Sequence, residues 1–342
     1  PIIVAGSGVL WAGAEQELTA FVERTGIPFF TTPQARGVVP EDHELCFLGA
    51  RSTAFQQADT VLLLGTRTNF IIGHALPPRF AADAKFIMVN SDATEIGHNR
   101  AIDAGIVGDA KLVLGQMLNA LDGFPDKRRT AWVEFLRQTD AARRERAEAE
   151  MATDQVPIHP MRLCRAVRDV LDRDAILIED GHEILNMARQ TIPSYTPRAR
   201  LNAGPNGCMG VCLPFALGAK AAHPTRQVVT LCGDGSFGMN VQELDTAVRH
   251  NLPFVAVISH NGGWTGAIRG RKVPGRDLRM TRYDEVARAF GCYGEYVERP
   301  EEIRPAIERA LASGQPAVVN VVTDPYAKAK TQPFGSYSAR LD

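Results

Sequence analysis

Hydrophobic residues along the chain alternate between short continuous runs and longer stretches with helical spacing. Runs of strand length occupy 1–5, 27–30, 60–64, 85–89, 175–179, 227–232, 254–259 and 317–323. Helical spacing occupies 14–25, 161–171, 212–222, 241–250, 283–290 and 300–312. Continuous apolar strands that alternate with amphipathic helices are typical of a parallel sheet covered by helices. The pattern therefore predicts an α/β protein with two open, mainly parallel-sheet domains.

A stretch of different character separates the two alternating regions. Residues 122–157 are charged and poor in aliphatic side chains, as in Asp126–Arg129 and Arg143–Glu150. Such composition predicts a solvated connecting helix. The predicted division is a domain at 1–121, a charged helical linker at 122–157, a domain at 158–325 and a tail at 326–342. A length of 342 residues is sufficient for two domains that each bury a core.

The charge balance and the ends of the chain exclude some classes of function. Lys and Arg number 38 against 39 Asp and Glu, without a long run of one sign, which disfavours a nucleic-acid partner. No apolar stretch approaches the roughly 20 residues of a membrane span. Pro1–Gly6 lacks a signal sequence and an initiator Met, so we expect the chain to begin partway through a longer protein. Six scattered cysteines without a CxxC pair predict buried thiols and a cytoplasmic location.

Polar residues follow two consecutive strands of the second region. Asp234 lies in the turn Gly233-Asp234-Gly235 after one strand, and Asn261 follows the next strand, 261 − 234 = 27 residues later. A right-handed crossover can bring two such strand ends side by side. Carboxylate, amide and backbone oxygens suit Mg²⁺ or Ca²⁺, and the amides of Gly235 and Ser236 could bind an anion. The alternative is a plain turn that ends a strand.

Residues 233–263 resemble the signature of thiamine-diphosphate-dependent enzymes, Gly-Asp-Gly followed some two dozen residues later by Asn-Asn. The resemblance implies that Asp234, Asn261 and the carbonyl of Gly263 bind Mg²⁺, which holds the diphosphate of the cofactor. His260 replaces the first asparagine, which is not a ligand, and we expect it to pack or to support the site. The cofactor-binding residues implied are Gly207, Cys208, Met209, Gly233, Asp234, Gly235, Ser236, Asn261, Gly263, Trp264 and Thr265.

Met209 occupies a second matching position, within Gly207-Cys208-Met209-Gly210. The family carries a large apolar residue here, which wedges between the two rings of the cofactor and bends it. An unbranched, adaptable methionine suits this role. The alternative is an ordinary core methionine.

The resemblance extends over the whole chain, to the central domain (1–121) and the pyrophosphate-binding domain (158–342) of the pyruvate-oxidase-like group. Residues 65–70, 76–80, 85–89 and 324–334 favour the branch of 2-hydroxyacyl-CoA lyase and oxalyl-CoA decarboxylase. In this branch the Rossmann-like central domain binds ADP or CoA, and the tail folds over the acyl-CoA. Arg67 suits a phosphate, although a surface salt bridge is the alternative. The matching nucleotide positions are Gly6, Ser7, Gly8, Arg67, Ser91 and Asp109.

The resemblance implies a carbon–carbon lyase or ligase that interconverts a 2-hydroxyacyl-CoA with an aldehyde or ketone plus formyl-CoA. Family enzymes have an N-terminal pyrimidine-binding domain that supplies an activating glutamate, and nothing in this chain matches it. We expect the same or another polypeptide to supply that domain, and a homodimer or homotetramer to form. His182 and Glu183 follow a strand and are candidate catalytic residues, with His182 as a proton carrier or a structural histidine.

Three other functions stay open from the sequence. One is an acetolactate-synthase-like carboligase, or a 2-oxo-acid decarboxylase, that acts on small carbonyl substrates without CoA. Another is a cofactor-binding fragment or subunit without turnover of its own. A Rossmann dehydrogenase is disfavoured because no GxGxxG motif opens either region.

Overall fold

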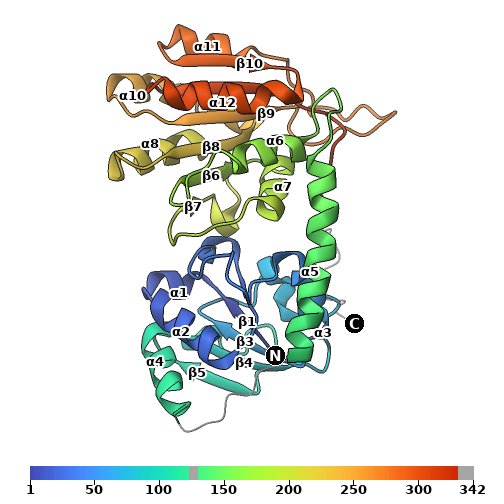
Figure 1. The fold of residues 1–342 in the computed structure, drawn as a ribbon, viewed down its shortest axis with the longest axis vertical. Helices are drawn as coiled ribbons and strands as arrows, with labels where there is room; N and C mark the ends of the chain where they lie inside the picture. Colours follow the sequence, from blue (N-terminus) through green and yellow to red (C-terminus); the bar gives the residue numbers. More distant parts are fainter. Residues whose placement is uncertain (123–129, 330–342) are drawn as a thin grey trace. The chain divides into compact units, whose positions relative to one another are not determined.

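A computed structural model describes residues 1–122 and 130–329 of the chain. Its contacts divide the described residues into two compact units, the first formed by Pro1–Arg146 with Ser194–Arg198, the second by Ala147–Pro193 and residues 199–329. Each unit contains one parallel sheet with helices on its faces (Figure 1). The predicted fold class, α/β with two open parallel-sheet domains, is confirmed.

The first unit has a sheet in the order β2-β1-β3-β4-β5. Ile3 of β1 is paired with Phe29 of β2 and with Leu62 of β3, in parallel register. Ile3 and Ala5 belong to one apolar cluster and Ile2 and Val4 to another, because successive side chains of a strand point to opposite faces. The strands are β1 (Ile2–Ala5), β2 (Phe29–Thr31), β3 (Thr60–Leu64), β4 (Lys85–Asn90) and β5 (Ala104–Val107). The α-helices are α1 (Ser7–Trp11), α2 (Glu15–Thr25), α3 (Arg51–Gln57) and α4 (Ala110–Ala120).

The second unit has a sheet in the order β10-β11-β9-β8-β6-β7. One face of the sheet packs on Leu163, Ala188 and Ile307, the other on Leu213 and Leu244. The strands are β6 (Ile176–Asp180), β7 (Arg200–Leu201), β8 (Val228–Gly233), β9 (Val255–His260), β10 (Tyr293–Val297) and β11 (Ala317–Val322). The α-helices are α6 (Pro160–Arg168), α7 (Glu183–Thr191), α8 (Cys212–Ala222), α9 (Asp234–Met239), α10 (Glu243–Arg249), α11 (Tyr283–Ala289) and α12 (Ile303–Ala312).

The hydrophobic pattern did not predict every element. β5 was missed because it is only four residues long, Ala104–Val107, and is largely exposed at the edge of the sheet. Helix α4 and the strands β7 and β10 were also not predicted. The Gly-Asp-Gly segment was expected as a turn, but Asp234 is the first residue of α9, so the chain enters a helix directly from β8.

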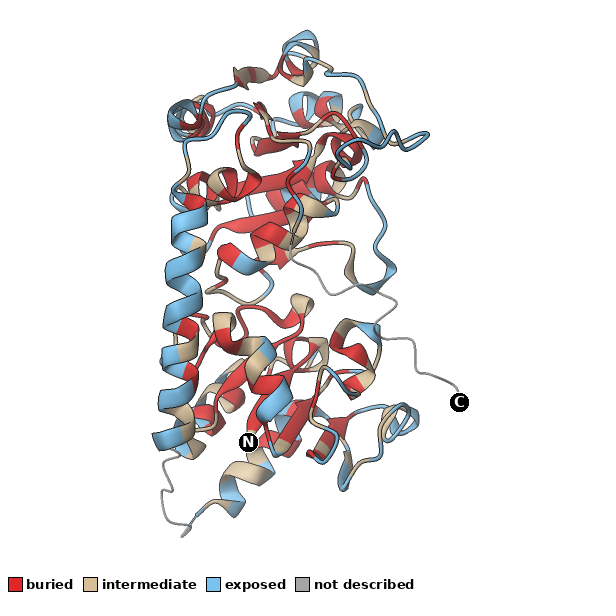
Figure 2. Cartoon of the chain, turned by 90° about the vertical axis from the view of Figure 1, so that its right-hand side faces the viewer, coloured by how far each residue is buried: buried red, intermediate tan, exposed pale blue. Residues whose placement is uncertain are grey.

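A long helix, α5 (Thr130–Met151), lies within the segment predicted as a charged linker. Most of its surface is exposed (Figure 2), while Leu136 and Asp140 are buried, the latter accepting a hydrogen bond from the amide of Gly49 at 2.6 Å. Asp126–Arg129 of the predicted linker and positions 330–342 of the predicted tail lie outside the described residues.

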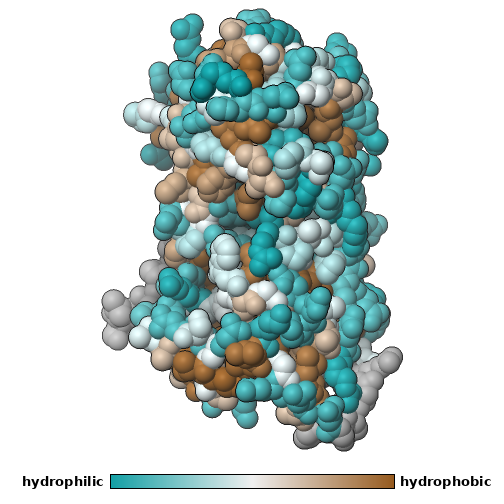
Figure 3. All heavy atoms as spheres, turned by 90° about the vertical axis from the view of Figure 1, so that its left-hand side faces the viewer, coloured by the Kyte–Doolittle hydropathy of each residue, from teal (hydrophilic) through white to brown (hydrophobic). Residues whose placement is uncertain are grey.

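The face drawn in Figure 3 is mostly hydrophilic, with hydrophobic patches on both units. None of the helices within 1–122 and 130–329 combines the length and apolar composition needed to cross a bilayer.

Candidate functional site

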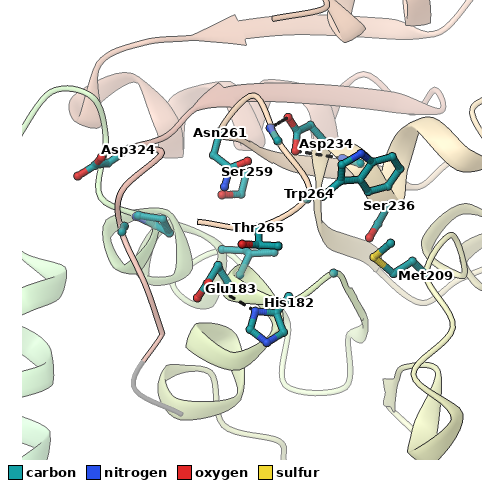
Figure 4. A pocket seen from close by; sticks show the side chains of 17 residues that line it. His182, Glu183, Met209, Asp234, Ser236, Ser259, Asn261, Trp264, Thr265 and Asp324 are labelled. Atoms are coloured by element: carbon teal, nitrogen blue, oxygen red, sulfur yellow. Dashed lines mark hydrogen bonds and ion pairs between the residues drawn. The ribbon is translucent and has the colours of Figure 1, made fainter. Parts of the chain in front are cut away.

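A pocket opens at the carboxyl ends of β6, β8 and β9, three neighbouring strands of the second unit (Figure 4). The chain leaves β6 for β7 at the edge and then returns to β8 on the other side of β6. Ligands of parallel sheets bind at such a switch in strand order. The lining residues are Pro160, Gly181, His182, Glu183, Ile184, Met209, Gly233, Asp234, Gly235, Ser236, Ser259, Asn261, Gly263, Trp264, Thr265, Asp324 and Ala327.

Asp234 is one of three acidic residues that line this pocket, with Glu183 and Asp324, and is 1% exposed. Its Oδ1 accepts a hydrogen bond from the amide of Gly235 at 3.0 Å, and its Oδ2 accepts one from the amide of Gly263 at 3.1 Å. Burial raises the pKa of Asp234 above its usual range, although the amides and His260 act in the opposite direction. A cation at this carboxylate would offset the cost of burying its charge.

Asn261 lies on the strand end beside Asp234, as the 27-residue spacing predicted. Gly233 of β8 is paired with Ser259 of β9, so the two strand ends are adjacent. Within the described residues, the buried side-chain oxygens of Asn261 and Ser236 have no hydrogen-bond partner. Buried polar atoms are normally satisfied, so these oxygens indicate a ligand in the pocket.

The donor set fits a hard cation that takes part of its coordination from an anion. No group of three or more His, Cys, Asp or Glu side chains that could hold a metal occurs in the described ranges. A Mg²⁺ ion at Asp234 and Asn261 would therefore need further oxygens from backbone, water and ligand, which is how Mg²⁺ is commonly held with phosphates. The residues present fit a metal-bound diphosphate.

The loop after β9 places Gly263 against Asp234. The carbonyl of Gly262 accepts hydrogen bonds from the amide of Leu278 at 2.9 Å and from Nη1 of Arg276 at 3.3 Å. Gly263 and Asp277 form an isolated antiparallel β-bridge. The hydrogen bonds of this bridge use the amides of Trp264 and Leu278, and the Gly263 carbonyl takes no part in them. A Cβ on Gly263 would lie 2.4 Å from the guanidinium carbon of Arg276, so a side chain at this position would require the Arg276 guanidinium to move.

Trp264 covers the beginning of α9. A Cβ on Gly235 would lie 2.6 Å from Cε3 of Trp264, closer than real Cβ contacts allow. The glycine therefore lets the indole ring approach the backbone beside Asp234. This close approach also explains why Trp264 and Thr265, the two residues after Gly263, both line the pocket.

Met209 lines the pocket and is 38% exposed, so it is not a core residue. Oδ2 of the buried Asp180 accepts hydrogen bonds from the amides of Gly210 at 2.9 Å and Cys212 at 3.0 Å. The side-chain amide of Asn240 donates to the Gly210 carbonyl at 2.7 Å. These bonds fix the chain directly after Met209.

The two residues before Met209, Gly207 and Cys208, are not among the residues that line the pocket, and their contact with the cofactor stays a prediction. Cys208 is exposed, whereas all six thiols were expected to be buried; the other five cysteines are buried and free.

His182 and Glu183 lie at the start of α7 and line the side of the pocket away from Asp234 and Asn261 in Figure 4. Nδ1 of His182 is 3.4 Å from Oε1 of Glu183. The hydrogen bond to Glu183 raises the pKa of His182. Burial alone would raise the pKa of Glu183, but hydrogen bonds from His182 and from backbone amides outweigh it and hold the pKa below its usual range.

His260 supports the site from behind, as expected for a residue that is not a ligand. It is 0% exposed, and its Nδ1 is 3.0 Å from the side-chain oxygen of Asn320. Its Nε2 lies 3.7 Å from Oδ2 of Asp234. The ring also packs beside Tyr283, with 5.7 Å between ring centroids.

Several lining residues were missed from the sequence. Ser259 is the last-but-one residue of β9, and Asp324 and Ala327 follow β11. Ser259 lies at the carboxyl end of β9, which is adjacent to β8, and Asp324 and Ala327 follow β11, which is adjacent to β9. Gly181 directly follows β6, while Pro160 and Ile184 belong to the first turns of α6 and α7.

The nucleotide-site residues of the first unit follow β1, β3, β4 and β5 and therefore lie at one edge of its sheet. The amide of Gly8 donates to the Gly65 carbonyl at 2.8 Å and is not free for a phosphate. A Cβ on Gly6 would lie 2.4 Å from that same carbonyl, so these glycines serve close backbone packing.

The charged and polar members of this set have local partners. The guanidinium of Arg67 is 68% exposed and lies 3.1 Å from Glu95, the surface salt bridge considered as the alternative. Asp109 caps α4 by accepting from the amides of Lys111 and Leu112. Ser7 is the first residue of α1, and Ser91 is exposed after β4.

Comparisons with known proteins agree with this geometry. Residues 1–117 match the model of the thiamine pyrophosphate enzyme central domain, and residues 184–321 match that of the thiamine pyrophosphate enzyme C-terminal TPP-binding domain. The chain is 42% identical over 331 residues to an acetolactate synthase large subunit of Mycobacterium tuberculosis, covering 95% of this chain and 59% of that protein. It is 36% identical over 348 residues to a 2-hydroxyacyl-CoA lyase of Arabidopsis thaliana, covering 97% of this chain and 61% of that protein.

An oxalyl-CoA decarboxylase of Escherichia coli K12 is 34% identical over 337 residues, covering 96% of this chain and 59% of that protein. The chain therefore spans about three-fifths of the length of these relatives.

Proposed function

Because the chain belongs to the thiamine pyrophosphate enzyme family and contains its central and C-terminal domains, we propose that its second unit binds the diphosphate of thiamine diphosphate through Mg²⁺. Asp234, Asn261 and the Gly263 carbonyl would hold the ion. The observation that carries this proposal is the buried Asn261 oxygen without a partner in the described chain, on the strand end beside the Asp234 carboxylate.

When bound, thiamine diphosphate supplies a nucleophilic carbon and an electron sink for breaking or forming a carbon–carbon bond beside a carbonyl. The protein orients the cofactor and excludes water. Met209 would set the conformation of the cofactor because its side chain enters the pocket from a loop fixed by Asp180. His182 would hold a proton near the reacting atoms, since it lines the pocket and Glu183 raises its pKa, which increases its protonated fraction.

The reaction proposed is the cleavage of a 2-hydroxyacyl-CoA into an aldehyde or ketone plus formyl-CoA, or its reverse. The bond between the thioester carbon and the hydroxyl-bearing carbon breaks, the hydroxyl loses its proton, and the thioester carbon gains one, so no co-reactant is needed. Two relatives named for CoA substrates support this proposal, the lyase of Arabidopsis thaliana and the decarboxylase of Escherichia coli. The exposed guanidinium of Arg67 at the carboxyl edge of the first sheet would meet a phosphate of CoA.

A second candidate is an acetolactate-synthase-like carboligation of small 2-oxo acids without CoA. The specific observation that favours it is the 42% identity to the acetolactate synthase large subunit of Mycobacterium tuberculosis. Because the chain spans about three-fifths of its relatives, a third candidate is a cofactor-binding part that turns over substrate only with a pyrimidine-binding domain from the same or another polypeptide.

Titration of CoA into the protein by calorimetry, with and without thiamine diphosphate and Mg²⁺, distinguishes the candidates. The lyase proposal predicts saturable binding of CoA, and release of formyl-CoA from a 2-hydroxyacyl-CoA once a pyrimidine-binding domain is present. Acetolactate formed from pyruvate without any CoA binding would favour the carboligase instead. Sedimentation analysis of the same samples tests the proposed homodimer or homotetramer.

A further inference from the structure

A short segment after β11 forms one wall of the pocket. We call Asp324–Ala329 the strap. Asp324 and Ala327 of the strap line the pocket. The amide of Asp324 donates to the Ile158 carbonyl at 2.8 Å, which fixes the first residue of the strap to the segment before α6.

The carboxylate of Glu183 holds the far end of the strap. Its Oε2 accepts a hydrogen bond from the amide of Ala329 at 2.7 Å. Its Oε1 lies 3.4 Å from Nδ1 of His182, and the amide of Gly266 stabilises the same carboxylate. The side chain is only 13% exposed, so these contacts are shielded from water. One carboxylate thus joins the start of α7, the loop after β9 and the strap.

The strap also lies directly against the loop at Gly266. A Cβ on Gly266 would be 3.0 Å from the Ala327 carbonyl oxygen and 3.1 Å from Cγ of Lys328. The amide of the next residue, Ala267, donates to the Pro325 carbonyl at 2.5 Å. On the outer side, the guanidinium of Arg269 stacks over the Tyr326 ring at 4.4 Å. The loop therefore packs along the strap at residues 325–328, directly before the Glu183 contact at Ala329.

We propose that Glu183 is a positioning residue that fastens the strap to the pocket wall, and not a group that exchanges protons with the substrate. Each of its oxygens already faces a donor of this chain, His182 and Gly266 on one side and Ala329 on the other. The strap fixed in this way contributes Asp324 and Ala327 to the pocket lining, with Asp324 on the side away from Met209 in Figure 4, and so shapes access for the acyl part of the substrate. Only the role of the strap in access for the acyl part of the substrate rests on the proposed function.

We call the contact between Glu183 and the strap the tether. Hydrogen exchange of the chain, read by mass spectrometry on peptides covering 325–329, tests this tether without any catalytic turnover. In Glu183→Ala, amide exchange in these residues should rise about tenfold to a hundredfold, as expected for the loss of a hydrogen bond to a charged group. Glu183→Gln should give a smaller rise, because one acceptor oxygen remains. Glu295→Gln is the matched control, since Glu295 is 15% exposed and also has both oxygens occupied, by Arg309 at 2.8 and 2.6 Å. It should leave exchange of the strap unchanged.

A second variant tests the tether from the other side of the contact. Gly266→Ala leaves the carboxylate intact but places a methyl group against Ala327 and Lys328, and it should also increase exchange of the strap. Unchanged exchange in 325–329 in both Glu183→Ala and Gly266→Ala would overturn the proposal.

Kinetics separate a tether from a proton carrier. In the assembled enzyme, Glu183→Gln should raise the KM for the acyl substrate several-fold and keep both limbs of the pH profile of kcat, with only a shift of the limb of His182, whose pKa Glu183 raises. A fall in kcat with loss of one limb of its pH profile, without a change in KM, would assign Glu183 to proton transfer instead. A chain that binds neither CoA nor thiamine diphosphate would remove the proposed function, whereas faster exchange of the strap in Glu183→Ala would still support the tether.

Discussion

Asp180 is expected to contribute more to the stability of the site than any residue that lines the pocket, although it is not itself a lining residue. The side chain is 2% exposed and accepts three backbone hydrogen bonds, from Gly181 at 2.7 Å, Gly210 at 2.9 Å and Cys212 at 3.0 Å. In Asp180→Asn one carboxylate oxygen becomes an NH₂ group. At least one amide then faces a donor, and the remaining bonds lose their charge.

The magnitude follows from these three bonds. A hydrogen bond to a charged group contributes about 1.5–3 kcal/mol and a neutral one about 1 kcal/mol. One charged bond lost and two made neutral should lower the free energy of unfolding of the second unit by about 2.5–7 kcal/mol. Because Gly210 follows Met209 directly, thiamine diphosphate should also bind more weakly.

Urea unfolding followed by circular dichroism, together with calorimetric titration of thiamine diphosphate, measures both effects. Asp169→Asn is the control, because Asp169 is a partly exposed acid of the same unit whose partners Arg165 and Arg168 lie at the surface, and its effect should stay within about 0.5 kcal/mol. If Asp180→Asn matched this control in both stability and cofactor affinity, the account of the Met209 loop would be wrong.

Three further predictions concern the pocket and the first unit. Met209→Ala should leave the affinity for thiamine diphosphate within about threefold but lower turnover at least tenfold, as measured by calorimetry and by initial rates. Arg67→Ala should weaken CoA binding about tenfold or more. Glu95→Ala frees the Arg67 guanidinium and should preserve or strengthen CoA binding. Equal affinities for CoA in the unmodified chain and in both variants would refute a phosphate contact. The pH dependence of strap exchange should follow the pair His182 and Glu183. The charged contact between His182 and Glu183 is fully present below the ordinary His182 pKa of 6.5 and is lost as pH rises through its raised pKa. The contribution of Glu183 is lost only as pH falls through its own pKa, which lies below 4.5. Protection of the strap amides from exchange should therefore decline as pH rises through the raised pKa of His182.

The sequence predicted the sheets well because their strands are buried on both faces and form continuous apolar runs. β3 and β8 illustrate this, since every residue but the first of β3 is buried and β8 is buried up to its last glycine. β5 is only four residues long and largely exposed, and only the register of β4 with Ala104–Val107 reveals it. The helical start at Asp234 was hidden because glycine on each side of an aspartate is equally typical of a turn.

The candidate site was predictable where strand ends meet, and less so where long loops return. Asp234 and Asn261 follow adjacent strands, and spacing was enough to bring them together. The contact between Glu183 and Ala329 joins positions 146 residues apart, which no local pattern encodes. The glycines Gly6 and Gly8 look like a phosphate-binding turn in sequence, yet the amide of Gly6 donates to the Leu64 carbonyl and the amide of Gly8 to the Gly65 carbonyl.

The central claim is that Asp234 and Asn261 bind a metal that holds the diphosphate of thiamine diphosphate. Calorimetric titration of the cofactor with and without Mg²⁺ tests it directly, with Asp245→Ala as control because Asp245 is a half-exposed acid paired with Arg249. Binding should require Mg²⁺ in the unmodified chain and in the control, and should weaken at least about tenfold in Asp234→Ala and in Asn261→Ala. Equal, Mg²⁺-independent affinity in all four proteins would contradict the account.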